Sequence, residues 1–168
     1  MPRVTHQLDP QFAALDLALL QDAALSTCRA FNATYACMRV QQIKTRVLHL
    51  RDQQVETSLD HRDLGVGVRV VVDGAWGFAA TSSLAPAAVR RAARRACELA
   101  QRCAGLPGPR VQIAEEPVAR GTHISSYTVD PFDVPVAAMV DVLRERAGLM
   151  QSLDHTSASL ECAKETVF

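Results

Sequence analysis

Five histidines and five cysteines are the side chains in this sequence that could ligate a metal or activate a nucleophile. They are His6, His49, His61, His123, His155, Cys28, Cys37, Cys97, Cys103 and Cys162. No histidine precedes a glutamate, no two histidines lie one helical turn apart, and no Cys-x-x-Cys occurs. A zinc site needs three or four well-placed ligands. The sequence therefore predicts no metal ligand and no catalytic residue, and a Cys/His dyad would require a coincidental approach in the fold.

A second group of residues with chemical potential surrounds one turn. It consists of Gly65, Gly67, Arg69, Trp76 and Phe78, on either side of an Asp73-Gly74 pair. Asp-Gly between apolar runs is the strongest short-range signal for a two-residue type I′ hairpin, and the alternation of side chains then sets these five residues on one face. There an arginine can stack on an aromatic ring, and glycines can admit another backbone. We take them as candidate substrate or interface residues, although ordinary sheet packing explains each one singly.

The opposite face of the same hairpin is shallow and apolar. Its valines are Val66, Val68, Val70 and Val72, which the register places opposite Thr81, Ala79, Gly77 and Ala75. Residues 86–103 supply a helix to cover this face, because Pro86 suits a first helical turn and an alanine-rich stripe follows it. The five arginines on the other side of that helix are typical of a solvated surface.

These residues carry a resemblance to a known family. The string Gly65-Val-Gly-Val-Arg69, the string Gly74-Ala-Trp-Gly-Phe-Ala79 and the Pro-started helix after them resemble the N-terminal region of the TldD/PmbA metallopeptidases. The Trp-Gly-Phe form is more similar to the TldD branch than to the PmbA branch. The resemblance runs over about residues 15–168, and it covers only the first part of a family member.

The resemblance implies a zinc-dependent peptidase that acts on peptides and works as paired subunits, either alike or one TldD-like with one PmbA-like. In the family, a helix-borne histidine-glutamate-histidine motif holds zinc and its glutamate is the general base. That motif is missing here, so no zinc ligand can be assigned to any residue and the chain alone is expected to be inactive and free of stoichiometric zinc. We expect zinc only in the full-length family, and a partner that is a second copy or another TldD/PmbA subunit.

The patterning predicts an α+β fold, with a twisted antiparallel sheet of at least four strands and two or three packed helices. Helical periodicity marks residues 10–31, 86–103 and 136–150. Alternation marks strands at 35–49, with a phase slip at Gln41-Gln42 that suggests a bulge, at 55–59, and in the two arms of the hairpin. A last strand, 156–168, is expected to end without a partner as an exposed edge.

The expected domain organisation has three parts. Residues 1–8 form a flexible tail, residues 9–150 form the N-terminal α/β domain of TldD/PmbA type, and residues 151–168 begin a following strand region that is cut short. A truncated gene product, a partial sequence and an N-terminal module all remain open.

Composition bounds the partners. The formal net charge is zero and 48% of residues are hydrophobic, so no basic field supports a nucleic-acid role. The N-terminus lacks an apolar signal-like region, and no apolar run approaches the roughly 18 residues that span a bilayer. Five widely spaced cysteines are typical of reduced, buried thiols, so we expect a cytoplasmic protein without a membrane partner. Two hypotheses remain: the N-terminal domain of a TldD-like zinc metallopeptidase, and a stand-alone, non-catalytic binding or assembly module.

Overall fold

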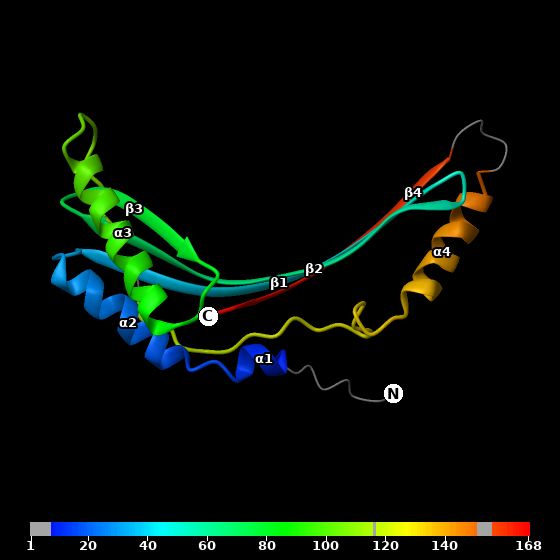
Figure 1. The fold of residues 1–168 in the computed structure, drawn as a ribbon, viewed down its shortest axis with the longest axis horizontal. Helices are drawn as coiled ribbons and strands as arrows, with labels where there is room; N and C mark the ends of the chain where they lie inside the picture. The colour runs from blue at the N-terminus through cyan, green and yellow to red at the C-terminus, as the bar shows by residue number, and fades with distance from the viewer. Residues whose placement is uncertain (1–7, 116, 151–155) are drawn as a thin grey trace. The chain divides into compact units, whose positions relative to one another are not determined.

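The computed structural model describes residues 8–115, 117–150 and 156–168. Its helices are α1 (Pro10–Ala13), α2 (Leu17–Ala30), α3 (Pro86–Ala104) and α4 (Val136–Gly148), and its strands are β1 (Tyr35–Arg51), β2 (Gln54–Val72), β3 (Ala75–Thr81) and β4 (Ser157–Val167). The strands form one sheet in the order β3-β2-β1-β4 (Figure 1). This antiparallel α+β fold confirms the predicted class. The predicted tail lies outside the described residues except for Leu8.

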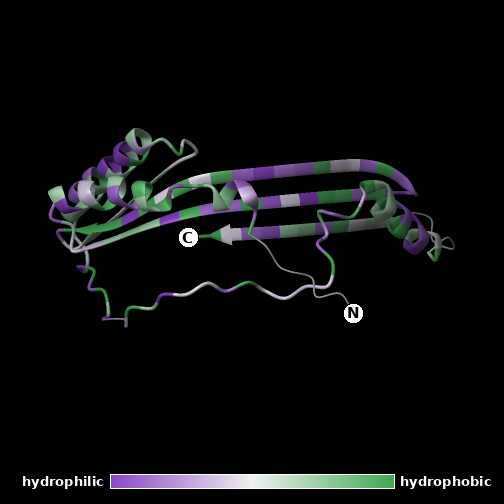
Figure 2. Ribbon diagram, turned by 90° about the horizontal axis from the view of Figure 1, so that it is seen from below, coloured by the Kyte–Doolittle hydropathy of each residue, from purple (hydrophilic) through white to green (hydrophobic). Residues whose placement is uncertain are grey.

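The chain divides into two compact units. Unit 1 contains Ile43–Arg62 and His123–Glu165, and unit 2 contains Asp9–Gln42, Asp63–Thr122 and Thr166–Phe168. Strands β1 and β2 contribute residues to both units, and hydrophobic and hydrophilic residues alternate along them (Figure 2).

Unit 2 is built on small side chains. Its buried core comprises Phe12, Leu20, Ala23, Ala24, Cys28, Val40, Val66, Val68, Val70, Val72, Ala79, Val89, Ala92, Ala93, Ala96, Cys97 and Ala100. Helix α3 packs on β3, and α2 packs on α3. Helix α3 and strand β3 approach closely at Gly77, where an added Cβ would lie 1.9 Å from the carbonyl oxygen of Ala96 and 2.9 Å from the amide nitrogen of Ala100. The predicted agreement between an alanine-rich helix and a shallow valine face is confirmed.

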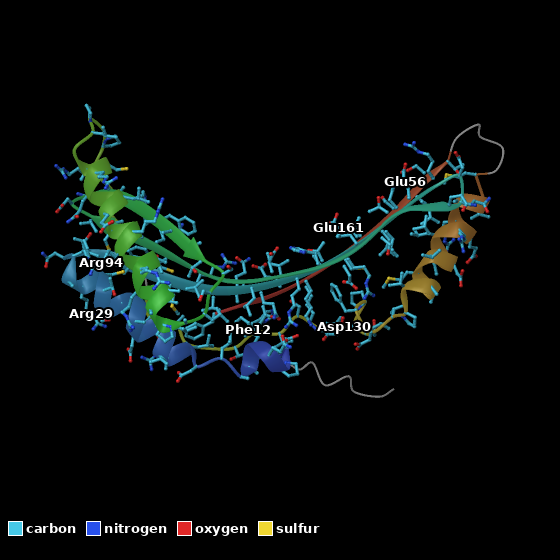
Figure 3. All side chains as sticks on the ribbon, in the orientation of Figure 1. Phe12, Arg29, Glu56, Arg94, Asp130 and Glu161 are labelled. Atoms are coloured by element: carbon cyan, nitrogen blue, oxygen red, sulfur yellow. The ribbon has the colours of Figure 1, made fainter. Side chains whose placement is uncertain are left out.

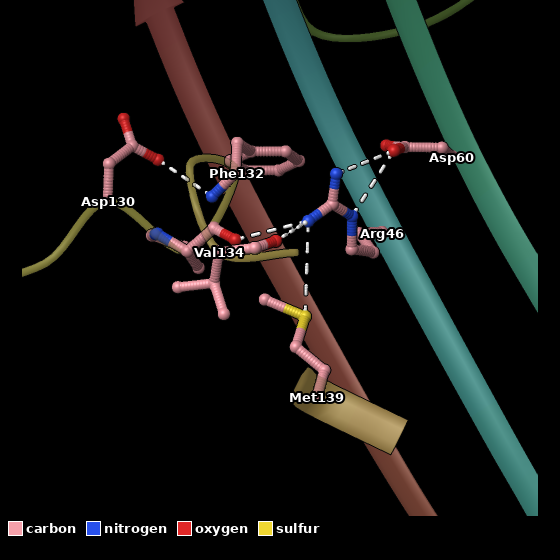
Figure 4. A network of polar contacts seen from close by, with 7 residues as sticks. Arg46, Asp60, Asp130, Phe132, Val134 and Met139 are labelled. Carbon is pink, nitrogen blue, oxygen red and sulfur yellow. Dashed lines mark hydrogen bonds and ion pairs between the residues drawn. The ribbon is translucent and has the colours of Figure 1, made fainter. Parts of the chain in front are cut away.

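Unit 1 has a smaller apolar core and a buried cation. Leu48 and Leu50 of β1 pack with Met139, Val140 and Leu143 of α4, and β4 adds three half-buried residues. The cation is the guanidinium of the buried Arg46, whose polar contacts Figure 4 draws.

The Arg46 side chain joins β2 to the segment that leads into α4. Its Nη2 donates to Asp60 Oδ2 over 2.8 Å and its Nε donates to the same oxygen over 3.2 Å. Its Nη1 donates to the carbonyl oxygens of Pro131, at 3.2 Å, and Val134, at 3.0 Å. The ring of Phe132 lies 5.4 Å from the guanidinium carbon. The chain before α4 is therefore held by a charge-assisted network as well as by apolar contacts.

Two predicted helix and strand boundaries are wrong. Residues 10–31 form α1 and α2 rather than one helix, because Asp16 caps a new helix and its Oδ1 accepts from the Leu19 amide over 2.9 Å. One strand, β2, contains both the predicted strand at 55–59 and the first arm of the hairpin. Three strands, β1, β2 and β3, therefore lie between α2 and α3 instead of four. The fourth strand is β4.

The prediction that the last strand has no partner is also wrong. Strand β4 pairs with β1, and the amides and carbonyls of Val40 and Phe168 exchange two hydrogen bonds of 2.9 Å. Since β4 stands last in the strand order, its other side is an edge of this sheet.

The phase slip predicted at Gln41-Gln42 is absent from β1, because the alternation of buried and more exposed side chains continues through these two residues. Val40, Gln42, Arg46, Leu48 and Leu50 are all buried, so even-numbered residues keep the same alternation across this stretch. Two polar members of that set, Gln42 and Arg46, made the apolar pattern look broken.

Candidate functional site

The predicted type I′ hairpin positions the candidate residues. Asp73 and Gly74 have φ values of 51° and 74°, the left-handed conformation that both central residues of this turn require. The pairing of β2 with β3 runs from Val72 opposite Ala75 to Val66 opposite Thr81. The predicted register is therefore confirmed.

The glycine-aromatic face consists of Gly65, Gly67, Arg69, Trp76 and Phe78. Arg69 pairs with Phe78 in the ladder, but its guanidinium carbon lies 5.3 Å from the centroid of the Trp76 ring. A second aromatic ring, Tyr35 of β1, meets Trp76 edge-on at 5.6 Å between centroids. Trp76 is 40% exposed and Phe78 is 59% exposed. These two contacts hold the Trp76 ring in a defined position. The side chains of Trp76 and Phe78 both keep much of their surface open to water.

At the two glycines of this face, other atoms of the hairpin lie close to the β2 backbone. A Cβ at Gly67 would lie 3.1 Å from Cε2 of Phe78, so the Phe78 ring covers this backbone. A Cβ at Gly65 would lie 3.1 Å from the carbonyl oxygen of Thr81. The absence of a side chain at Gly67 lets the Phe78 ring lie across the sheet.

A hollow of about 210 Å³ borders the same hairpin, and Trp76 is one of its walls. The loop after α3 forms the other side. It is held to the turn by a hydrogen bond of 2.8 Å from the Val111 amide to the Gly74 carbonyl and by the Arg110 guanidinium on the Asp73 carbonyl. Trp76 thus offers one surface beside Arg69 and another at this hollow.

A polar cluster that sequence reasoning missed lies in unit 1. His49 Nδ1 is 2.8 Å from Glu56 Oε2, and His49 Nε2 is 3.0 Å from Ser157 Oγ. His49 belongs to no ligand or catalytic motif in the sequence. A hairpin register centred on Asp52-Gln53 would have placed His49 opposite Glu56, whereas Ser157 arrives only through the pairing of β4 with β1.

A second polar cluster ties β4 to the loop before α4. Lys164 Nζ donates to Asp130 Oδ2 over 2.5 Å and to the hydroxyl of Tyr127 over 3.3 Å. Burial works against ionisation of Asp130, but the hydrogen bond from Lys164, the Phe132 amide and the charges of Lys164 and Lys44 lower its pKa overall. The hydrogen bond to Asp130 is the main reason that the pKa of Lys164 is raised.

The cysteines fall into different environments. Cys28 of α2 and Cys97 of α3 are buried in contact with one another, and burial raises the pKa of both thiols, that of Cys97 to about 12. Cys103 is exposed, so the expectation of a buried thiol is wrong for this cysteine. Buried thiols with raised pKa values are poor nucleophiles.

The described residues offer no cluster of metal-ligating side chains. Within residues 8–115, 117–150 and 156–168, no three His, Cys, Asp or Glu side chains come together as a possible ligand set. Zinc therefore does not fit the described part of this chain. In the same residues, no helix has the length and apolar character that a bilayer crossing demands.

Comparison with known proteins identifies what the hairpin region resembles. Residues 38–100 match the sequence model for PmbA/TldA metallopeptidase domain 1. That match includes all five residues of the glycine-aromatic face and most of α3. No curated protein matches the chain.

Solved structures share the fold. A candidate modulator of a DNA gyrase from Thermotoga maritima is 12% identical, with a TM-score of 0.58, and the match covers 90% of this chain and 35% of that one. A candidate modulator of DNA gyrase from Bacteroides thetaiotaomicron is 13% identical, with a TM-score of 0.62 and coverages of 90% and 36%. TldE from Thermococcus kodakarensis is 14% identical, with a TM-score of 0.56 and coverages of 89% and 34%. The chain spans about a third of the length of these proteins.

Proposed function

Because this chain contains the N-terminal domain of the PmbA/TldD family, we propose that it serves a TldD-like zinc metallopeptidase that hydrolyses peptides in the cytoplasm. In this proposal the chain contributes to the substrate cleft and to the subunit interface. The zinc ligands and the general base come from outside residues 1–168, since the described residues offer no ligand set. The partner is a second copy or another subunit of the TldD/PmbA family.

The exposed glycine-aromatic face is the observation that carries this proposal. Trp76 and Phe78 lie in the region that matches the family domain, and both keep large apolar surfaces in water. Aromatic and arginine side chains are the residue types that most often dominate binding energy at protein interfaces. Arg69 and Tyr35 fix the Trp76 ring, so little side-chain freedom would be lost on binding.

Association is the first property to test. We expect the chain to bind itself or a co-expressed TldD- or PmbA-type subunit, with Trp76→Ala and Arg69→Ala weakening the association at least about tenfold. Arg95→Ala is the matched control, because Arg95 is an exposed arginine of α3 outside this face. Light scattering at micromolar concentration and native mass spectrometry measure the masses, and circular dichroism checks folding.

A monomer mass under these conditions, together with no complex with either family subunit, would contradict the interface role. Equal weakening by Arg95→Ala would place the contact elsewhere. These outcomes leave the domain assignment intact and remove the proposed use of its surface.

Metal content separates the zinc enzyme from the stand-alone binding or assembly module. We expect no peptidase activity and no zinc retained on dialysis for the isolated chain, and peptidase activity with zinc when the chain is joined to a part that carries the missing motif. The DNA downstream of codon 168 provides that part if it encodes a helix with a His-Glu motif. A stop codon there, with no activity in any family complex, would favour the binding module.

A further inference from the structure

Three side chains from three strands of unit 1 form a serine-histidine-glutamate chain. His49 belongs to β1, Glu56 to β2 and Ser157 to β4. The imidazole lies between the other two, with Nε2 3.0 Å from Ser157 Oγ and Nδ1 2.8 Å from Glu56 Oε2. Both distances are within the range for a nucleophile on its base and for that base on its orienting group.

The partners of the imidazole define what each nitrogen can do. A carboxylate can only accept hydrogen bonds, so Nδ1–H donates to Glu56 and, in the neutral ring, Nε2 carries the lone pair. That lone pair faces the hydroxyl of Ser157 and can take its proton. Glu56 thus holds the tautomer that a general base needs, which is the role of the carboxylate in serine hydrolases.

The cluster lies on the face of the unit 1 sheet that is opposite to α4. His49 alternates with Leu48 and Leu50, whose side chains pack with α4, so it points to the opposite face. Figure 3 shows Glu56 on the side of the strands opposite to Asp130. The His49 side chain is 31% exposed and that of Glu56 is 45% exposed, and Ser157 is exposed as well. A small molecule can therefore reach the serine oxygen directly.

Arg51 adds a cation beside the cluster. Its Nη1 lies 3.5 Å from Glu56 Oε1, while Oε2 of the same carboxylate faces His49. The two oxygens therefore have separate partners. The arginine therefore lies beside the carboxylate oxygen that does not face the imidazole, and the oxygen that faces His49 has no competition from this ion pair.

From this geometry we propose that Ser157 is an acyl-accepting nucleophile, with His49 as its general base and Glu56 as the positioning residue. Ser157 Oγ attacks the carbonyl carbon of an ester as its proton passes to His49 Nε2. The ester C–O bond breaks, the alcohol or phenol leaves with the proton that His49 gives back, and an acyl-serine forms. Water then attacks this acyl group while His49 accepts one of its protons. The bond from the acyl carbon to Ser157 Oγ breaks, His49 returns the proton to Oγ, and a carboxylic acid is released.

The open setting indicates the class of substrate. The hydrolysis would favour small esters of good leaving groups, because such groups depart without strong protonation and need the least stabilisation of the oxyanion. This activity is independent of the proposed zinc peptidase role, since it uses residues of unit 1 and needs no metal.

A fluorophosphonate probe on the 168-residue chain tests the reactive serine. In labelling, Ser157 Oγ bonds to phosphorus, fluoride leaves and His49 takes the proton. We expect one label per chain on the peptide that contains Ser157, read by mass spectrometry, and no label in Ser157→Ala. Ser159→Ala is the matched control, because Ser159 is exposed two residues along the same strand, and it should label as the parent does.

The imidazole is tested by His49→Gln, which should lower the labelling rate and the turnover of 4-nitrophenyl acetate by about 100-fold or more. Glu56→Gln should lower both rates while leaving the fold intact, as circular dichroism would show. Absence of label in the parent, label elsewhere that persists in Ser157→Ala, or parental rates in either His49→Gln or folded Glu56→Gln would overturn the proposal and leave a cross-strand hydrogen bond. If His49→Gln fails to fold, the Glu56→Gln rates decide.

Discussion

Different kinds of contact stabilise unit 1 and unit 2 internally. In unit 2, small apolar residues of α2, α3 and the sheet interdigitate, and Gly77 lets the helix backbone approach the strand. In unit 1, five larger apolar residues form the buried core, and the buried Arg46 and the Lys164–Asp130 pair supply further links. A closely packed core is destabilised when a substitution adds volume, whereas a buried ionic network is destabilised when a substitution removes one partner. The same sheet therefore has two distinct weak points.

Gly77→Ala should have the largest effect on stability. The added Cβ would lie 1.9 Å from the carbonyl oxygen of Ala96 and 2.9 Å from the amide nitrogen of Ala100. Both are backbone atoms of α3, so α3 must move away from β3. We expect a loss of about 3 kcal/mol or more in the free energy of unfolding, measured by urea denaturation. Gly108→Ala is the control because nothing lies within 4 Å of its added Cβ. Equal stability of the two variants would show that α3 does not pack closely on β3.

Arg46→Met should have the next largest effect, confined to unit 1. The substitution keeps an apolar stem but leaves the carbonyl oxygens of Pro131 and Val134 without their donor. We expect a cost of about 2 kcal/mol and faster hydrogen exchange in α4, with α2 and α3 unchanged.

Asp60→Asn is the control for Arg46. Asp60 is 57% exposed, so losing its charge should cost less than about 1 kcal/mol. If Asp60→Asn is as damaging as Arg46→Met, the ion pair rather than the bonds to the two carbonyls holds the segment before α4.

The same contrast explains what could be predicted from the sequence. The hairpin and its register were predictable because Asp73-Gly74 fixes the turn. Helix α3 was predictable because its alanines recur at helical spacing, and their small side chains suit the face formed by the alternating valines of β2. Unit 1 was harder, since its alternation on β1 contains the buried Gln42 and Arg46. In the sequence, a buried polar residue interrupts the apolar alternation of a strand, and the interruption is easily mistaken for a shift of the buried side chains to the other face.

Long-range pairing set the other limit. The break between α1 and α2 depends on Asp16 capping a helix, a local signal that the apolar stripe concealed. The pairing of β4 with β1 joins residues more than a hundred positions apart, such as His49 and Ser157. Among the candidate site residues, those on one hairpin were placed correctly, and those that needed β4 were missed.

The Lys164–Asp130 contact should give the smallest effect, and one that depends on pH. The pKa of Asp130 is lower in the folded chain than its ordinary value, so the folded state binds the proton less well than the unfolded state. The stabilisation is then complete above the ordinary aspartate pKa near pH 4, and it disappears as the pH falls through the lower folded value. Asp130→Asn keeps an oxygen for the Phe132 amide while removing the charge that Lys164 meets.

At pH 7 we expect Asp130→Asn to be about 1 kcal/mol less stable than the parent, with the difference shrinking as the pH falls below about 4. Urea denaturation across this range measures it. Asp141→Asn is the control, since Asp141 is 76% exposed and lies 4.0 Å from Arg144, and its stability should follow that of the parent at every pH. A difference for Asp130→Asn that stays constant down to pH 2 would mean that the carboxylate charge contributes nothing. Unit 1 would then depend on Arg46 as its stabilising cation, and the contrast with the apolar packing of unit 2 would rest on that residue.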